Sequence, residues 1–284
     1  MSTTDNFQEL LNLEKIEEDH YRGINAAVPM PRVFGGQVLA QALQAAINTV
    51  SPERHVHSFH AYFLRGGITT MPILFEVDRI RDGGSFTTRR VVAIQKGEAI
   101  FSMSASFQKE EEGLTHQIEM PKVPDPDELP SDNEVREKHA EEFPALKFML
   151  MMKWPMETKN TGSLNEIDPQ KLSPEQHVWM RFTDPLPDDA NVHKTALAFA
   201  SDLGFMGTSL RPHGISFMQG KLQGASLDHA MWFHRPFRAD EWLLYSMDSP
   251  SSAGARGFNR GSIFNRQGEL VASTAQEGLI RLTK

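Results

Sequence analysis

The segment from Val33 to Pro52 constrains the fold most, because it runs for twenty residues without a charge. Its amide side chains recur at intervals of four, three and four residues, which is one stripe of an α-helix; they are Gln37, Gln41, Gln44 and Asn48. These amides argue against a membrane span, which needs about 20 predominantly apolar residues. A helix with no charge on any face is surrounded by protein. We therefore predict a core helix that begins at Gly35-Gly36 and ends before Ser51-Pro52.

Strand patterns follow this helix. Runs of alternating, β-branched or aromatic residues occupy 55–64, 73–80, 85–95 and 98–108, with turn signals between the last three. In the second half, strands are predicted at 154–159, 177–182, 226–234, 242–249, 255–267 and 269–281. Between them, Asp188 is placed to cap a helix that runs to Leu203, with Gly204 as its C-terminal stop.

The two halves of the sequence resemble each other. A shift of 169 residues places His60-Ala61 on His229-Ala230, and a shift of 171 places Arg89 on Arg260. The order of the predicted elements also matches, so we predict an α+β fold made of two repeats, each a helix plus a curved antiparallel sheet. The N-terminal repeat would span 1–115 and the C-terminal repeat 149–284. The acidic, proline-rich segment 116–148 would be a linker.

Charge and cysteine content exclude several classes of function. The 29 basic and 37 acidic residues give a net charge of −8, which disfavours nucleic acid or an anionic membrane as a partner. Without cysteine there is no disulfide, thiol nucleophile or cysteine zinc site. The polar N-terminus is not a signal peptide, and Arg281-Leu-Thr-Lys284 is not a peroxisomal address. We expect a cytoplasmic protein.

Common catalytic signatures are missing from the sequence. It contains no G-x-S-x-G elbow, no phosphate-binding G-x-x-x-x-G-K-[ST] loop, no G-x-G-x-x-G and no H-E-x-x-H. Nucleotide hydrolysis, Rossmann-type redox chemistry and zinc proteolysis are therefore disfavoured. We expect neither a metal nor another cofactor.

Nine short motifs together resemble the acyl-CoA thioesterase II family, which has a double hotdog fold. They are Leu10–Lys15, Arg32–Gln37, His57–His60, Tyr62–Arg65, Ala200–Leu203, Asp228-His229, Met231–Pro236, Ala255–Gly257 and Gln276–Gly278. The resemblance covers nearly the whole chain and implies hydrolysis of acyl-CoA to a fatty acid and CoA. It also implies medium- to long-chain substrates, a role in fatty-acid metabolism, and a homodimer or homotetramer.

The resemblance further implies three catalytic residues in the second repeat. By motif, the acid is Asp202 in Ala-Ser-Asp-Leu, the hydroxyl is Ser226 in Ala-Ser-Leu-Asp-His, and the amide is Gln276 in Ala-Gln-Glu-Gly. Asp202 would act as general base while Ser226 and Gln276 orient a water. Ser226 stands where related sequences often have threonine, which supplies the same hydroxyl. A covalent acyl-Ser226 route is the alternative, although it needs a base within reach.

The position of Asp202 supports this assignment on physical grounds. It lies in the last turn of its predicted helix, where a carboxylate opposes the helix dipole by about 0.3–1 kcal/mol. An unfavourable placement calls for a reason, and a general base is one. On the sequence alone, an ordinary exposed or capping Asp is the favoured interpretation, and the family resemblance reverses this preference.

The first repeat is expected to be catalytically silent. In the repeat alignment Ser226 falls on His57 and Gln276 falls on Ala105, which has no polar side chain. One active site per chain would remain. His57 is the rival to Asp202 as base.

Binding of CoA by an acidic protein requires local arginines, because arginine pairs well with phosphate. Arg256 and Arg260 are the predicted pair, with Arg81, Arg89 and Arg90 as further candidates. Two other functions stay open at this point. One is a hotdog enoyl-CoA hydratase, and the other is an acyl-CoA-binding protein without catalysis.

Overall fold

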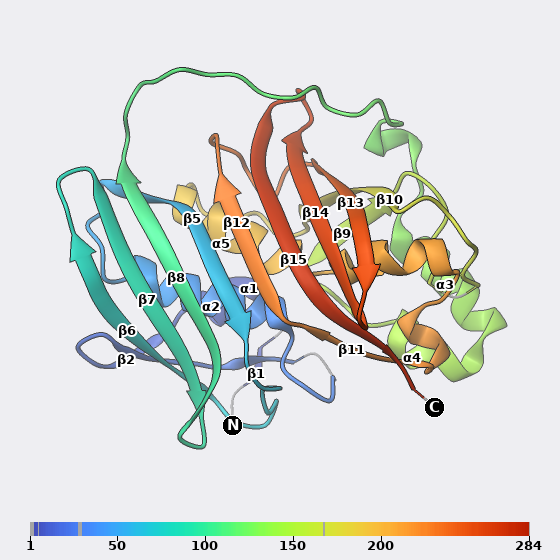
Figure 1. Cartoon of the computed structure of the whole chain (residues 1–284), viewed down its shortest axis with the longest axis horizontal. Coiled ribbons are helices and arrows are strands. Elements are labelled where there is room, and N and C mark those ends of the chain that lie inside the picture. The colour runs from blue at the N-terminus through green and yellow to red at the C-terminus, as the bar shows by residue number, and fades with distance from the viewer. Residues whose placement is uncertain (1–2, 5, 28–29, 167, 284) are drawn as a thin grey trace. The chain divides into compact units, whose positions relative to one another are not determined.

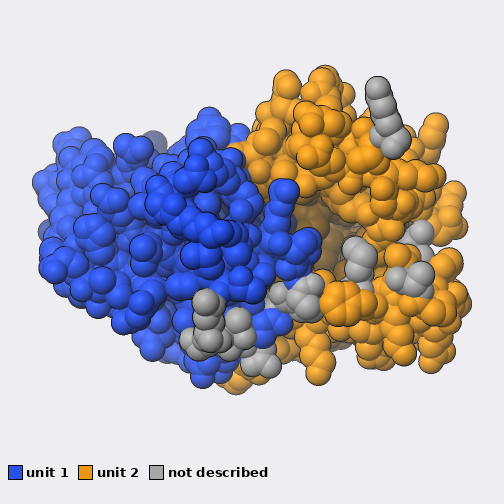
Figure 2. Space-filling model, turned by 90° about the horizontal axis from the view of Figure 1, so that it is seen from below, with its two compact units in different colours: residues 1–116, 186–203, 228–236 blue, residues 117–185, 204–227, 237–284 orange. Residues whose placement is uncertain are grey.

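The computed structural model describes residues 3–4, 6–27, 30–166 and 168–283. It divides into two compact units, coloured separately in Figure 2. Unit 1 comprises residues 1–116, 186–203 and 228–236, and unit 2 comprises 117–185, 204–227 and 237–284. Each unit therefore takes residues from both predicted repeats. The repeat boundaries remain a prediction, since compactness and internal repetition are separate properties.

Unit 1 is an antiparallel sheet with helices packed against it (Figure 1). The strand order is β2-β3-β6-β7-β8-β5-β12, and a short parallel pair β1-β4 lies outside this sheet. The strands are β1 (Thr3–Thr4), β2 (Glu14–Glu17), β3 (His20–Gly23), β4 (Asn25–Ala26), β5 (Arg54–Phe63), β6 (Ile73–Asp82), β7 (Phe86–Gln95), β8 (Glu98–Lys109) and β12 (Asp228–Phe233). The helices are α1 (Phe7–Leu11), α2 (Gly35–Ile47) and α5 (Ala190–Ser201).

Helix α2 is the core helix that the charge-free segment predicts. Its apolar residues from Val38 to Ala46 are buried, and it contacts strands β5 to β8 and helix α5. The two buried amides of the stripe, Gln37 and Gln41, bond to backbone and side chains within unit 1. Gln37 Nε2 donates to Asn25 Oδ1 (2.9 Å), and Gln41 Nε2 donates to the carbonyl oxygens of Ile24 (2.7 Å) and Leu10 (3.0 Å). The stripe therefore anchors α2 to neighbouring segments, which satisfies its polar groups without water.

Strands β5 and β12 pair in the register that two related copies require. His229 lies opposite Ala61, and Ala230 lies opposite His60. Each His-Ala dipeptide thus faces the antiparallel copy of itself, as it would across a two-fold axis. The offset between the copies is the 169 residues found in the sequence.

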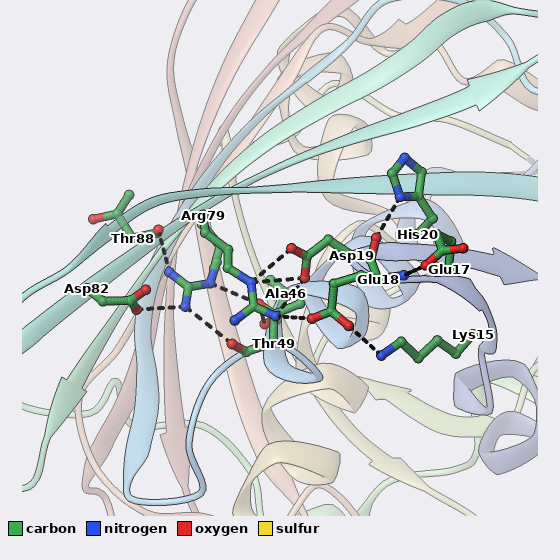
Figure 3. A network of polar contacts seen from close by, with 11 residues as sticks. Lys15, Glu17, Glu18, Asp19, His20, Ala46, Thr49, Arg79, Asp82 and Thr88 are labelled. Atoms are coloured by element: carbon green, nitrogen blue, oxygen red, sulfur yellow. Dashed lines mark hydrogen bonds and ion pairs between the residues drawn. The ribbon is translucent and has the colours of Figure 1, made fainter.

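Arg89 is a buried arginine on the inner face of the first repeat. The guanidinium of Arg89 on β7 is almost fully buried and donates to both oxygens of Thr49, at the end of α2. It also reaches Asp82 (2.7 Å) and the carbonyl of Thr88 (3.0 Å), and Figure 3 shows where these partners lie. Arg89 therefore has its donors occupied inside the protein and is inaccessible to a CoA phosphate.

The α5 residue Lys194 carries a largely buried ammonium group that contacts the backbone of β5. Its ammonium donates to the carbonyl of Val56 (3.0 Å), at the bulge in β5. Burial lowers the pKa of Lys194 from 10.5 to about 8, although Glu110 acts in the opposite direction. Between these values the unfolded chain binds the proton and the folded chain does not, so rising pH stabilises the fold.

We expect Lys194→Met to remove this dependence. From below pH 8 to above pH 10.5, the unfolding free energy of the wild type should rise relative to the variant by at most roughly 3 kcal/mol. Urea titrations of both proteins across this range measure the difference. Parallel curves would show that Lys194 keeps its ordinary pKa in the folded protein.

Unit 2 is an antiparallel sheet in the order β11-β15-β14-β13-β10-β9. Its strands are β9 (Met156–Asn160), β10 (Glu175–Phe182), β11 (Leu222–Ser226), β13 (Leu243–Ala253), β14 (Arg256–Asn265) and β15 (Leu270–Leu282). Its helical segments are η1 (Pro126–Glu128), α3 (Asp132–Glu142), η2 (Pro144–Leu146), α4 (Lys147–Leu150), η3 (Phe205–His213) and η4 (Phe217–Gln219).

The predicted linker segment packs into unit 2. Met120, Val123 and Leu129 cover a buried cluster whose members are Trp179, Trp242, Leu244 and Phe264. The indole of Trp179 donates to the carbonyl of Pro124 (2.9 Å). Part of the segment is also helical, in η1 and α3. Three apolar residues of the segment are therefore packed against the core of unit 2.

Within the described part of the chain, no helix is both long enough and apolar enough to cross a membrane. The charge-free segment runs from Val33 to Pro52, but the helix within it, α2, ends at Ile47.

Candidate active site

Ser226 and Gln276 share the buried face of neighbouring strands in unit 2. Ser226 ends β11 and pairs with Gly278 of β15, two residues beyond Gln276. Residues two apart on a strand point to the same face, so Ser226, Gln276 and Gly278 face the same way. Gln276 is fully buried and Ser226 half-buried. The structure therefore brings together two of the three predicted catalytic residues.

A break in the strand sets the position of Ser226. The predicted strand 226–234 is interrupted at Leu227, whose amide donates to the carbonyl of Glu277 (2.9 Å). The chain then continues as β12 in unit 1. The equivalent residue of the first repeat, His57, sits at the bulge between Val56 and Ser58 of β5. Both repeats thus depart from regular pairing at the same place.

Asp202 belongs to unit 1, where its carboxylate lies at the start of α2. It is the C-cap residue of α5, and a Cβ atom added to Gly35 would lie 2.5 Å from its Oδ2. Gly35 is the first residue of α2, and no side chain caps that helix at Phe34. The amide groups at such a helix start have no partner within the helix and carry partial positive charge.

The same geometry accounts for the unfavourable place of Asp202 in its own helix. As the C-cap of α5 the carboxylate meets the negative end of one dipole, but at Gly35 it meets the positive end of another. The second interaction offsets the first. The sequence around Asp202 cannot reveal its interaction with the start of α2, because α2 and α5 are far apart along the chain.

Two glycines allow this close approach of α2 to α5. A Cβ atom on Gly36 would overlap the backbone carbonyl oxygen of Phe199 and the ring of Phe34. The rings of Phe34 and Phe199 meet edge to face at 5.1 Å. A Cβ atom on Gly35 would also lie 3.0 Å from the ring of Phe63. The Asp202 carboxylate consequently lies beside aromatic carbon as well as backbone.

The first repeat holds different residues at the matching positions. Ala105 occupies the inner face of β8, and the Nε2 atom of His57 lies 2.8 Å from Ser106 Oγ. Burial lowers the pKa of His57, and the charge of Lys194 acts in the same direction. His57 is therefore largely neutral at pH 7.

The predicted alignment of Arg89 with Arg260 is wrong by one residue. Arg89 lies opposite Ala105 on the buried face, whereas Gln276 lies opposite the buried Asn259. Arg260 is the next residue along and points to the exposed face. Because side chains alternate along a strand, a slip of one position exchanges the two faces.

Arg256 and Arg260, the predicted CoA-binding pair, lie exposed on β14. Arg256 Nε lies 2.9 Å from Glu277 Oε1, and Arg260 pairs with Asp248. The bond to Asp248 raises the pKa of Arg260 further. Exposed ion pairs of this kind are worth about 0–1 kcal/mol. A phosphate could therefore replace either carboxylate at little cost.

Two residues beside the predicted set were missed by sequence reasoning. Ser201 directly precedes Asp202, and His229 follows Ser226 by three positions. The structure joins them, with 3.0 Å between Ser201 Oγ and His229 Nε2. Their adjacency to two predicted catalytic residues was the available signal.

Comparison with known proteins identifies relatives of both halves of the chain. Residues 145–279 match the family described as acyl-CoA thioesterase, and residues 26–108 match the acyl-CoA thioesterase N-terminal domain. The chain is 42% identical to the mouse protein acyl-coenzyme A thioesterase 8, over 96% of this chain and 88% of that protein. It is 38% identical to acyl-CoA thioesterase 2 of Haemophilus influenzae, over 98% of each chain.

A solved structure extends this similarity to the fold. The crystal structure of acyl-CoA thioesterase II TesB2 from Mycobacterium marinum superposes with a TM-score of 0.81 at 45% identity. The match covers 98% of this chain and 99% of that one.

Proposed function

Because the chain belongs to the acyl-CoA thioesterase family, with its double hotdog fold and acyl-CoA hydrolase activity, we propose a mechanism and a substrate range for it. The substrates are medium- to long-chain fatty acyl-CoA esters, and water attacks the thioester directly. Asp202 is the general base, and Ser226 and Gln276 orient the water. The observation that carries this proposal is the shared buried face of Ser226 and Gln276 on β11 and β15.

The proposed step balances without a cofactor. The water oxygen bonds to the thioester carbon while Asp202 accepts one water proton. The C–S bond then breaks, and the CoA sulfur leaves as a thiolate that takes up a proton. Negative charge develops on the carbonyl oxygen and needs N–H donors, for which a backbone amide at the start of α2 (Gly35 or Gly36) is our candidate.

We expect Gln276→Ala to lower kcat roughly 10²-fold, because a misplaced water attacks poorly. Ser226→Ala should retain part of the activity, and Ser226→Thr should restore it, since both hydroxyls hold water alike. The measurement is release of CoA thiol from acyl-CoA esters of short, medium and long chains. Because the protein has no cysteine, a thiol reagent detects only the product.

Ser262→Ala is the matched control, since it removes a half-buried hydroxyl from β14. Ser262 lies on the face of β14 opposite to that of Asn259, the residue across from Gln276. Its kcat should equal that of the wild type. Complete loss in Ser226→Ala, together with an acyl adduct on Ser226 in mass spectra of the wild type, would establish the covalent route instead. Absence of thiol release at every chain length would point to a binding protein.

A methionine lies beside the proposed water-orienting residues. Met206 covers Gly278, the partner of Ser226, so closely that a side chain on Gly278 would overlap its sulfur. Methionine adapts its shape to flexible ligands. For the other end of the substrate, we propose that the CoA phosphates bind Arg256 and Arg260, which would exchange their carboxylate partners for phosphate. Both arginines lie on the exposed face of β14, so the CoA moiety would pass from the face of Gln276 to the opposite one.

We also place the enzyme in the cytoplasm as a homodimer or homotetramer acting in fatty-acid metabolism. The lack of cysteine is compatible with a reducing compartment. Sedimentation of the purified protein distinguishes the two assembly states.

A further inference from the structure

A fully buried histidine stands next to the predicted site and has no part in the proposed mechanism. His229 lies on β12 and is packed in parallel on the ring of Phe59, with 6.0 Å between ring centres. Its Nε2 atom lies 3.0 Å from Oγ of Ser201, which is also fully buried. Ser201 is the last residue of α5, and Asp202 follows it as the C-cap.

The hydroxyl of Ser201 has one proton and lies 3.0 Å from the carbonyl oxygen of Ala198, to which it can donate. With its proton used there, Ser201 Oγ accepts the hydrogen bond from Nε2 of His229. This arrangement serves both contacts at once.

One end of this bond is anchored in the sheet. β12 is hydrogen-bonded along β5, with His229 directly opposite Ala61. The other end, Ser201, is buried in the last turn of α5. The pair thus connects the end of α5 to a strand of the unit 1 sheet at the residue before the carboxylate.

We infer that His229 and Ser201 are positioning residues for Asp202. Through their hydrogen bond they hold the last turn of α5 so that the carboxylate stays at the start of α2 beside Gly35. This inference rests on the proposed function, in which Asp202 is the base. A shift of about 1 Å in such a group can cost up to 10²-fold in rate.

The first test is Ser201→Ala, which removes the acceptor and keeps a good helix former. We expect kcat to fall roughly 10- to 100-fold with an unchanged KM, because substrate binding does not involve the pair. His229→Leu should act likewise, whereas His229→Gln, whose amide can donate in place of Nε2, should recover much of the loss. The double variant Ser201→Ala/His229→Leu should be no worse than the more impaired single variant.

Thr195→Val is the matched control. Thr195 is a fully buried residue of the same helix whose hydroxyl donates to the carbonyl of Asn191 (2.7 Å). Its kcat should stay within about twofold of the wild type. Equal losses in Thr195→Val and Ser201→Ala, additive effects in the double variant, or no rescue by His229→Gln would each overturn the inference.

The outcome for Asp202 separates the two proposals. If Asp202→Asn is inactive while Ser201→Ala keeps the wild-type kcat, the positioning role fails and the base assignment stands. If Asp202→Asn keeps its activity, the proposed function itself fails.

Discussion

Asp202→Asn is expected to lower kcat by about 10³-fold, within the range that removal of a general base produces. Asparagine has the same shape as aspartate but cannot accept the water proton. Its neutral amide should still fit beside Gly35, because it is the same size as the carboxylate whose Oδ2 atom lies there now. The fold should therefore persist while catalysis is lost.

CoA thiol release from a long-chain acyl-CoA measures this effect, and circular dichroism checks the fold. Asp184→Asn is a suitable control, since it removes an exposed carboxylate from the segment ahead of α5. If Asp202→Asn remained active, the base would lie elsewhere. His57 would then be the next residue to replace. Burial lowers its pKa and so favours the neutral ring, which is the form that can accept a proton.

The second large effect is expected from Gly35→Ala and Gly36→Ala, which should differ in kind. The new methyl group at 35 meets the movable end of the Asp202 side chain, so it should displace the carboxylate. We expect a kcat loss of roughly 10²-fold with a small change in stability. The methyl group at 36 meets the backbone of α5 at Phe199, which cannot move alone. We expect a loss of about 1–3 kcal/mol in stability.

Thermal unfolding and thiol release, measured on both variants, distinguish these outcomes. Gly84→Ala provides the control, because a Cβ atom there meets nothing within 4 Å. Wild-type kcat in Gly35→Ala would show that the contact with Asp202 has no bearing on the reaction. Unchanged stability in Gly36→Ala would show that the two helices can separate freely.

Periodic patterns predicted the elements that bury an apolar face. Helix α2 and strands β5 to β8 agree with their predicted ranges within a few residues. The strand β2 did not stand out, because all its residues are exposed and it has no alternation to detect. Helix α3 falls in the predicted linker and has no periodic apolar face to reveal it, since its residues are mostly charged and only Asp132 and Ala140 are buried.

The sequence identifies candidate residues for the site but not how they are arranged in space. Motif resemblance singled out Asp202, Ser226 and Gln276, yet the contact of Asp202 with Gly35 joins residues more than a hundred positions apart. The sequence also does not show that Asn259, and not Arg260, is the counterpart of the buried Arg89. Only strand register shows which of two adjacent residues faces inward, and the sequence match was one position out.

The path of the chain limits how the protein can be divided. Residues 186–203 and 228–236 return to unit 1, so the backbone passes between the two units five times. A fragment ending at residue 116 would lack β12 and α5, leaving the edge of β5 unpaired and one side of α2 bare. Such a fragment would be prone to aggregation. Gene truncation, domain exchange and fragment complementation must therefore keep the interleaved segments of both units together.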